Sequence, residues 1–273
     1  MSDLMQIYTN TQAMRTRASL VEVNDRLSTH QYRLSTGKRI NSAAEDPAGY
    51  ALSRTLEKRK RGLNVALQNT KNASSIMNIA EGGYQNIMDI IQTIKEKATQ
   101  AADYSLNISQ RTALDNQVKA LIEEVDEIVD DTTFNGQNLI NGNYSGEFHT
   151  GESFDDELSV SLLDADSAAL SINAMDLTTQ AAAKTAISQS SAAIDTLANA
   201  IQTVGEYKVR LNSKINALST QQTNTEAVRS TIEDADFAKE QMEVVKNQIL
   251  QQTSVSALTQ ANSAPQVVLS LIQ

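Results

Sequence analysis

The sequence predicts a mainly α-helical protein: an elongated antiparallel bundle of long helices with coiled-coil terminal helices and a small β-hairpin region. The 273 residues include only 10 Gly and 2 Pro, so few turns are available to interrupt helices. Aromatic residues make up 4% of the chain and Trp is absent, which is unusual for a compact enzyme of this length. Apolar and small side chains recur in alternating steps of three and four residues, the period of packed helices.

The N-terminal segment, residues 4–34, carries two stripes at helical spacing. One stripe consists of Leu20, Val23, Leu27, His30 and Leu34, and the other of Ile7, Met14, Ala18 and Val21. An isolated helix of this length is marginally stable, because most helical stability in proteins comes from packing. The stripes therefore predict a helix that packs against other helices.

The next segment predicts one long helix, roughly 58 Å in length at 1.5 Å per residue. Its seam comprises Leu63, Ala66, Thr70, Ala73, Met77, Ala80, Tyr84, Ile87, Ile91, Ile94, Ala98 and Ala101. Gly82 and Gly83 interrupt this segment, and we expect a local weakness there.

Two more segments keep the same rhythm. The shorter seam comprises Leu114, Val118, Leu121, Val125 and Ile128. The longer seam comprises Ile187, Ser190, Ile194, Leu197, Ile201, Val204, Lys208, Leu211, Ile215, Leu218, Gln222 and Thr225. Polar residues at seam positions set alignment or partner choice. Three helices with matching seams predict a side-by-side bundle.

Residues 132–180 differ in character from the rest. Phe134-Asn135-Gly136 and Asn141-Gly142-Asn143 are turn sequences. Residues 158–162 alternate apolar and polar side chains, as a half-buried strand does. One or two small hairpins are expected here.

The C-terminal segment, residues 235–262, offers a stripe of Ala238, Met242, Val245 and Ile249 and then becomes rich in Gln and Ser. Apolar stripes at both ends of one chain can pair with each other or with other copies. This pattern is typical of a protein that assembles.

Residues suited to catalysis are sparse. No cysteine is present, which excludes disulfides and thiolate chemistry. The two histidines, His30 and His149, lie in no catalytic or metal-binding motif, and His30 occupies a stripe position that favours a packing role. We therefore expect a protein that is no enzyme and has no catalytic, cofactor or metal site. An enzyme or a receptor-type binding module would require a pocket of convergent polar groups.

Charge is unevenly distributed along the chain. The formal net charge is −10, yet residues 1–62 hold 11 Lys and Arg against 6 Asp and Glu. This acidity argues against nucleic-acid binding, and no apolar run reaches the roughly 20 residues that span a bilayer. The basic cluster at residues 54–61 is expected either on a solvated face or against an acidic partner. The acidic run at residues 123–131, of the same chain or another copy, could supply that partner and aid alignment.

Four separated segments of the chain carry short motifs. Residues 34–51 read LSTGKRINSAAEDPAGYA and residues 134–139 read FNGQNL. The first is similar to the N-terminal signature of the bacterial flagellins, and the second to a turn of that family. Residues 232–240 (IEDADFAKE) and 257–273 (ALTQANSAPQVVLSLIQ) resemble its C-terminal motifs, with Thr231 in place of an Arg. These motifs occur in the family order and bracket nearly the whole chain.

The resemblance implies an architecture with two domains. Residues 1–42 and 233–273 would pair as the inner core coiled-coil domain. Residues 43–232 would form the outer core rod domain, with the β-hairpin island at about 132–180 and without the variable outer domains of larger flagellins. The hinge between the domains would comprise Gly37, Arg39, Asn41, Asp46, Pro47 and Gly49. Gly37 suits a helix end, and Asp46-Pro47 suits a helix start.

The implied function is that of a structural subunit that self-assembles into the flagellar filament for motility. A hook–filament junction protein, which shares flagellin-like ends, is the alternative. The expected assembly residues on the terminal helices are Ile7, Met14, Leu20, Val23, Leu27, Leu34, Met242, Val245, Ile249, Leu258, Val268, Leu269 and Leu271. The resemblance also implies an export chaperone, the flagellar type III export apparatus, filament-cap and hook-junction partners, and an extracellular location in the filament.

One further segment resembles the flagellin helix that a Toll-like receptor of animal cells reads. Residues 92–100 read QTIKEKATQ where the family has QRVRELAVQ. Gln92, Lys95, Glu96 and Gln100 match or nearly match, whereas Thr93 replaces a cation and Lys97 replaces an apolar residue. Each departure could cost about 1–3 kcal/mol of binding free energy, so we expect weak receptor activation.

Overall fold

The computed structural model describes residues 9–270, with side chains up to Ser263, and its chain divides into two compact units. The first unit contains the described residues up to Lys58 and those from Asn224 onward. The second unit spans Arg59–Thr223. The domain boundary implied by the family resemblance, after residue 42 and before residue 233, lies nearer the chain ends than this division.

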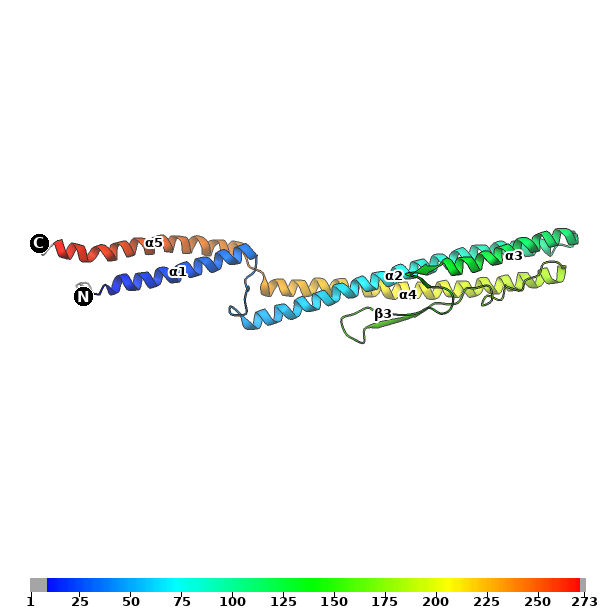
Figure 1. Cartoon of the computed structure of the whole chain (residues 1–273), viewed down its shortest axis with the longest axis horizontal. Coiled ribbons are helices and arrows are strands. Elements are labelled where there is room, and N and C mark those ends of the chain that lie inside the picture. The colour runs from blue at the N-terminus through cyan, green and yellow to red at the C-terminus, as the bar shows by residue number, and fades with distance from the viewer. Residues whose placement is uncertain (1–8, 271–273) are drawn as a thin grey trace. The chain divides into compact units, whose positions relative to one another are not determined.

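The first unit is built around helices from opposite ends of the chain. Helix α1 spans Thr11–Thr36 and helix α5 spans Phe237–Ser270. They lie side by side and run in opposite directions, since Asn10 contacts Ala261 and His30 contacts Glu240 (Figure 1). The first turns of α2 (Pro47–Ala101) and the last turns of α4 (Gln180–Glu233) complete the unit.

The second unit contains the remainder of α2 and α4, together with helix α3 (Ile108–Asp131) and two small hairpins. The α2 seam forms the centre of this unit, because every one of its twelve predicted positions is buried. Tyr84 is fully buried and donates its hydroxyl to the carbonyl oxygen of Leu163 at 2.5 Å. Burial raises the pKa of this hydroxyl well above its usual value.

Helix α2 continues without interruption through Gly82 and Gly83. A Cβ on Gly82 would meet nothing within 4 Å. One on Gly83 would lie 2.9 Å from the Thr132 hydroxyl oxygen and 3.0 Å from a methyl carbon of Ile140. Gly83 is therefore the place where the end of α3 and the following loop approach the α2 backbone closely.

The seams of α3 and α4 are confirmed, with a shift in α3. All twelve predicted positions of α4 are buried or half-buried. In α3 the predicted Leu121 and Ile128 are half-buried, while their neighbours Ile122 and Val129 are buried. This shift follows from packing, because α3 is covered both by α2 and by the loop that precedes α4.

Two hairpins confirm the expectation for the turn-rich island. Strands β1 (Thr133–Phe134) and β2 (Gln137–Asn138) flank Asn135 and Gly136, which both have positive φ, as a two-residue hairpin turn requires. Strands β3 (Ser145–His149) and β4 (Glu157–Ser161) pair antiparallel. β4 alternates exposed and buried residues, with Leu158 and Val160 facing the core.

Two buried or half-buried carboxylates of α3 hold the segment between β4 and α4. Asp115 is 2% exposed and accepts a hydrogen bond from the backbone N–H of Leu177 at 2.9 Å. Asp126 accepts from both the backbone N–H and the hydroxyl of Ser167, each at 2.8 Å. Acidic residues of this helix therefore fix a loop as well as covering a solvated face.

Candidate functional site: the terminal helix pair and its junction

The α1 seam packs against α5 as predicted from its spacing. Val23 is buried, and Leu20, Leu27 and Leu34 are half-buried. On α5 the positions turned toward α1 are Glu240, Val244, Asn247, Gln251, Ser254, Leu258 and Ala261, which keep the three-four alternation and are all buried or half-buried. The pair is thus a two-helix seam with many polar members.

Polar side chains join the two helices at three levels. Gln251 donates its side-chain amide to Asn24 at 2.7 Å, and Asn10 donates to the carbonyl oxygen of Ala261 at 2.8 Å. His30 lies 2.6 Å from the carboxylate of Glu240, which is 7% exposed. Polar groups inside a helical seam fix its register, because a slipped alignment would leave them unpaired.

The predicted C-terminal stripe faces away from α1. Met242, Val245 and Ile249 are 66%, 45% and 58% exposed. The second stripe of α1 is also exposed, with Met14 at 64% and Val21 at 53%. The sequence left open whether the apolar stripes pair with each other or with other copies. In the structure these exposed apolar residues take no part in the contact between α1 and α5.

The remaining predicted assembly residues lie toward the two ends of the chain. Leu258 is half-buried in the seam with α1. Val268 and Leu269 belong to the last turns of α5, where side chains are not described. Ile7 and Leu271 fall outside the described residues.

The predicted hinge residues form a clasp between the end of α1 and the break between α4 and α5. Gly37 ends α1 in a left-handed conformation (φ 69°) and its carbonyl oxygen accepts from the N–H of Ala235 at 2.9 Å. Arg39 donates its backbone N–H to the carbonyl oxygen of Glu233 at 2.7 Å and its guanidinium to that of Ile232. Together these bonds tie two segments that are far apart in the sequence.

The other hinge residues shape the turn into α2. Asn41 donates its side-chain amide to the carbonyl oxygen of Lys38 at 2.9 Å. Pro47 is the first residue of α2, and Asp46 caps the helix by accepting from the N–H of Gly49 at 2.9 Å, as expected. A Cβ on Gly49 would overlap the Asp46 carboxylate, so only glycine allows this cap.

A buried ion-pair network completes the clasp. The Glu233 side chain is 5% exposed, and its carboxylate oxygens lie 2.6 Å from the Lys38 ammonium nitrogen and 2.8 Å from a guanidinium nitrogen of Arg229. Burial alone would raise the pKa of Glu233, but the hydrogen bonds from Lys38 and Arg229 outweigh it, so the pKa lies below its usual value. Arg229 also binds Glu226, and this hydrogen bond is the main reason that its own pKa is raised.

The receptor-like segment lies on α2 in the second unit. Gln92, Glu96 and Gln100 are exposed, and Lys95 is half-buried. Gln92, Lys95 and Glu96 line a shallow depression together with Thr99 and with Ile194 of α4. The matching residues are therefore presented on one face of the helix.

Sequence reasoning missed the polar half of the α1–α5 seam. It selected the apolar stripe of α5 and left open whether that stripe meets α1 or another copy, so it did not identify the face turned toward α1. The signal that could have identified this face is the unbroken spacing from Glu240 to Ala261, combined with the polar members His30 and Asn24 of the facing stripe.

The described residues hold neither a helix suited to a membrane nor a cluster suited to a metal ion. Within residues 9–270, no helix is long and apolar enough to cross a bilayer. Among the described side chains, no three His, Cys, Asp or Glu gather closely enough to hold a metal ion.

Comparisons with known proteins match both ends of the chain to one family. Residues 7–145 match the family model of the bacterial flagellin N-terminal helical region, and residues 187–272 match that of the C-terminal helical region. The flagellar filament 33 kDa core protein of Treponema phagedenis is 31% identical over 286 residues, which cover 98% of this chain and 100% of that protein.

Two solved structures share the fold. The crystal structure of Bacillus cereus flagellin has a TM-score of 0.52 at 24% identity and covers 59% of this chain and 94% of its own. A Vibrio parahaemolyticus structure assigned to the flagellar hook-associated class has a TM-score of 0.59 at 11% identity and covers 70% and 100%. With both family models matched in order over most of the sequence, the chain belongs to the bacterial flagellins.

Proposed function

We propose that this flagellin is the main structural subunit of a flagellar filament, and that its terminal helices dock on other copies through their outward apolar stripes. The observation that carries the proposal is the exposure of Met242, Val245 and Ile249 on a helix whose other face is already occupied by α1. Burying apolar side chains in the polymer would release about 25 cal/mol per Å² of surface removed from water. Filament assembly supplies a partner for a surface that is otherwise costly in water.

The stripe is testable by charge insertion. Replacing Val245 and Ile249 by Asp should reduce elongation onto filament seeds at least tenfold, measured by electron microscopy of filament length against time. The matched control replaces the exposed polar residues Gln241 and Gln248, on the flank of the same helix, by Asp, which adds the same charge and should leave elongation within about twofold of the parent. Normal elongation of the stripe variant would contradict the proposed docking face.

The alternative role, a hook–filament junction protein, would use the same terminal helices in a different position. The filament role is favoured by the 31% identity to a filament core protein over nearly the whole chain, against 11% to the hook-associated structure. Two experiments together separate the roles: imaging cells in which the gene is deleted, and measuring the protein composition of filaments from wild-type cells. A filament composed mostly of this chain supports the subunit role, and a trace amount at its base supports the junction role.

In this role the chain works by assembly and performs no catalysis. We expect it to travel through the flagellar type III export apparatus with a chaperone, and to meet the filament cap and hook-junction proteins outside the cell. The terminal segments would order on insertion, at a cost on the order of 1–2 kcal/mol per residue that burial between copies must offset. Pull-down of the chain with the export chaperone, and its loss on truncation of α5, would test this route.

Weak recognition by a Toll-like receptor is also proposed. Gln92, Glu96 and Gln100 are exposed, whereas Thr93 and Lys97 replace a cation and an apolar residue of the family motif. A reporter-cell assay should show low potency for the parent and higher potency for Thr93→Arg/Lys97→Leu. Full potency of the parent chain would refute the proposal.

A further inference from the structure

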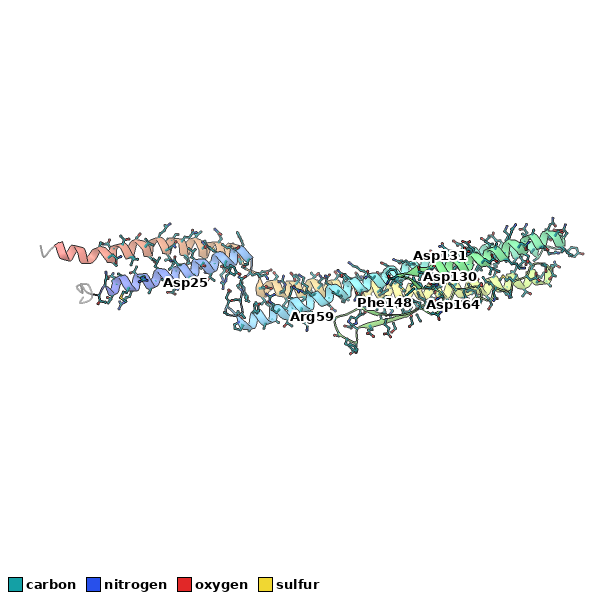
Figure 2. The ribbon with its side chains drawn as sticks, in the orientation of Figure 1. Asp25, Arg59, Asp130, Asp131, Phe148 and Asp164 are labelled. Carbon is teal, nitrogen blue, oxygen red and sulfur yellow. The ribbon has the colours of Figure 1, made fainter. Side chains whose placement is uncertain are left out.

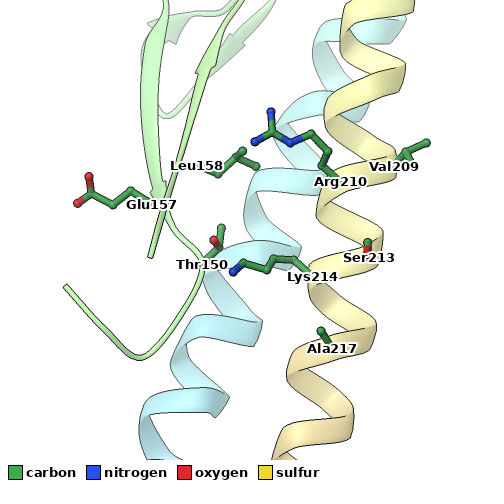
Figure 3. A pocket seen from close by; sticks show the side chains of 8 residues that line it. All are labelled: Thr150, Glu157, Leu158, Val209, Arg210, Ser213, Lys214 and Ala217. Atoms are coloured by element: carbon green, nitrogen blue, oxygen red, sulfur yellow. The ribbon is translucent and has the colours of Figure 1, made fainter. Parts of the chain in front are cut away.

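The second unit carries a groove between the β3–β4 hairpin and α4 that the terminal helices do not use. Its volume is about 520 Å³, and its lining includes Thr150 and Leu158 on the hairpin side and Arg210 and Lys214 on α4. The side chains of Arg210 and Lys214 extend from α4 toward the hairpin, while Glu157 points away from the groove (Figure 3). The two cations are four residues apart and so share one face of the helix.

The positive charge of this groove is poorly neutralised. Arg210 is exposed and forms no ion pair with any residue that the structure describes. Lys214 is 43% exposed and lies 3.8 Å from Asp156, at the limit of an ion pair. A partner with several carboxylates at helical spacing would complement both side chains.

The same unit presents such a surface on α3. Glu123, Glu124 and Glu127 are exposed and have no ion-pair partner within the described part of the chain. Asp130 and Asp131 extend this acidic face, and Figure 2 shows both on α3. Asp130 accepts one long hydrogen bond from Asn138 at 3.4 Å, which leaves most of its charge available.

One copy cannot bring these two surfaces together. Figure 1 shows helix α3 and the hairpin of β3 at different places along α2 and α4. Two contacts along α2 give the offset. Lys208, next to the groove, pairs with Glu81. Thr132, at the end of α3, lies against Gly83, and the acidic residues of α3 extend from there away from the groove. The separation is about ten helical residues, or roughly 15 Å.

We propose that the acidic face of α3 in one copy docks on the Arg210–Lys214 groove of a neighbouring copy. This inference rests on the proposed polymerisation and assigns which surfaces of the second unit meet. A contact between two different patches is heterologous, so each added copy leaves one groove and one acidic face free for the next. The axial offset between the patches gives successive copies a shift along the long helices, as an open helical polymer requires.

Charge reversal tests the pairing. The groove variant Arg210→Glu/Lys214→Glu and the acidic-face variant Glu123→Lys/Glu127→Lys should each polymerise at least tenfold more slowly at low salt, followed by light scattering. The chain carrying all four substitutions should recover to within about threefold of the parent, because the reversed surfaces attract again. The control Lys71→Glu/Lys184→Glu removes two other exposed cations and should polymerise like the parent.

A second measurement needs no variant. Filaments grown from equal amounts of ¹⁴N- and ¹⁵N-labelled chains are treated with a carbodiimide, which couples an amine to a carboxylate in direct contact. Mass spectrometry should find Lys214 joined to Glu123, Glu124 or Glu127 in mixed-isotope peptides, which arise only between copies. Absence of this link, or failure of the fourfold variant to recover while circular dichroism shows it folded, would overturn the inference.

The groove pairing and the filament role can be contradicted separately. Reversed variants that polymerise like the parent overturn only the groove pairing. A parent chain that never elongates on seeds overturns the proposed function, and the groove pairing with it. Capture of a different acidic protein by the groove, with no link between copies, would also overturn the pairing.

Discussion

At Glu233 two cations and a backbone amide converge on a single buried residue. Lys38 and Arg229 bind its carboxylate, and Arg39 binds its carbonyl oxygen. These partners come from both sides of the clasp, so one side chain links the end of α1 to the end of α4. Removing an ionised partner from such a site leaves the remaining charges uncompensated.

The pKa of Glu233 lies below its usual value of 4.5, so the stability of the folded chain should fall as the pH is lowered. Its ionised form therefore stabilises the folded state above about pH 4.5, and this contribution is lost as the pH falls through the lowered folded-state pKa. Glu233→Gln filaments should melt at a lower temperature than the parent at pH 6, and the difference should shrink toward pH 3. Asp25→Asn, which removes an exposed carboxylate of α1, is the control and should show no such convergence.

Asp115 offers a second prediction at the residue scale. Replacing it by Ala leaves the buried N–H of Leu177 without its acceptor, which should lower the free energy of unfolding by about 1–3 kcal/mol. Urea unfolding followed by circular dichroism measures this change. Glu124→Ala on the same helix removes an exposed carboxylate and should change stability by less than about 0.5 kcal/mol. Equal effects of the two substitutions would contradict the assigned role of Asp115.

Within α2, adjacent glycines provide a matched pair at the scale of the element. Gly82→Ala adds a Cβ into open space and should stabilise the helix by about 0.5–1 kcal/mol. Gly83→Ala pushes a Cβ against Thr132 and Ile140, so the same gain should be offset by overpacking of about 1–3 kcal/mol. Thermal unfolding should rank Gly82→Ala above the parent and Gly83→Ala below it. The opposite ranking would show that α3 yields at this contact.

Sequence spacing predicted the long helices well because most of their seam positions are apolar or small. In α2 each of the twelve seam positions is buried, and in α4 each is buried or half-buried. The strand at residues 158–162 and the turn at Asn135-Gly136 were equally legible, since period two and positive φ leave clear signatures.

The same reasoning did not identify the face of α5 that contacts α1. That helix has an apolar stripe on one side and a polar seam containing Glu240 and Asn247 on the other, and period alone cannot say which side meets α1. The choice depends on partners such as His30 and Asn24, which lie more than 200 residues away in the sequence. The family resemblance implied the hinge residues of the clasp but not their partners near the break between α4 and α5, because backbone hydrogen bonds leave no residue pattern.

At the scale of the whole molecule, the basic N-terminal part and the acidic remainder predict salt-sensitive assembly. Residues 1–62 hold 11 Lys and Arg against 6 Asp and Glu in a chain whose net charge is −10. Between about 0.05 and 0.5 M salt the screening length falls from beyond 10 Å to only a few Å. The elongation rate should therefore fall severalfold over this range, as measured by light scattering. An unchanged rate would show that apolar contacts alone govern association.

The clasp at Gly37 and Glu233 has a consequence for synthesis. Lys38 and Glu233 are separated by 195 positions in the sequence. The first unit therefore forms only when both ends of the polypeptide are present. A polypeptide broken off by premature termination or cleavage anywhere between them would possess α1 but no helix to receive it. Such fragments would lack the α1–α5 pair and could not dock through it, so only molecules that contain both ends would enter the filament.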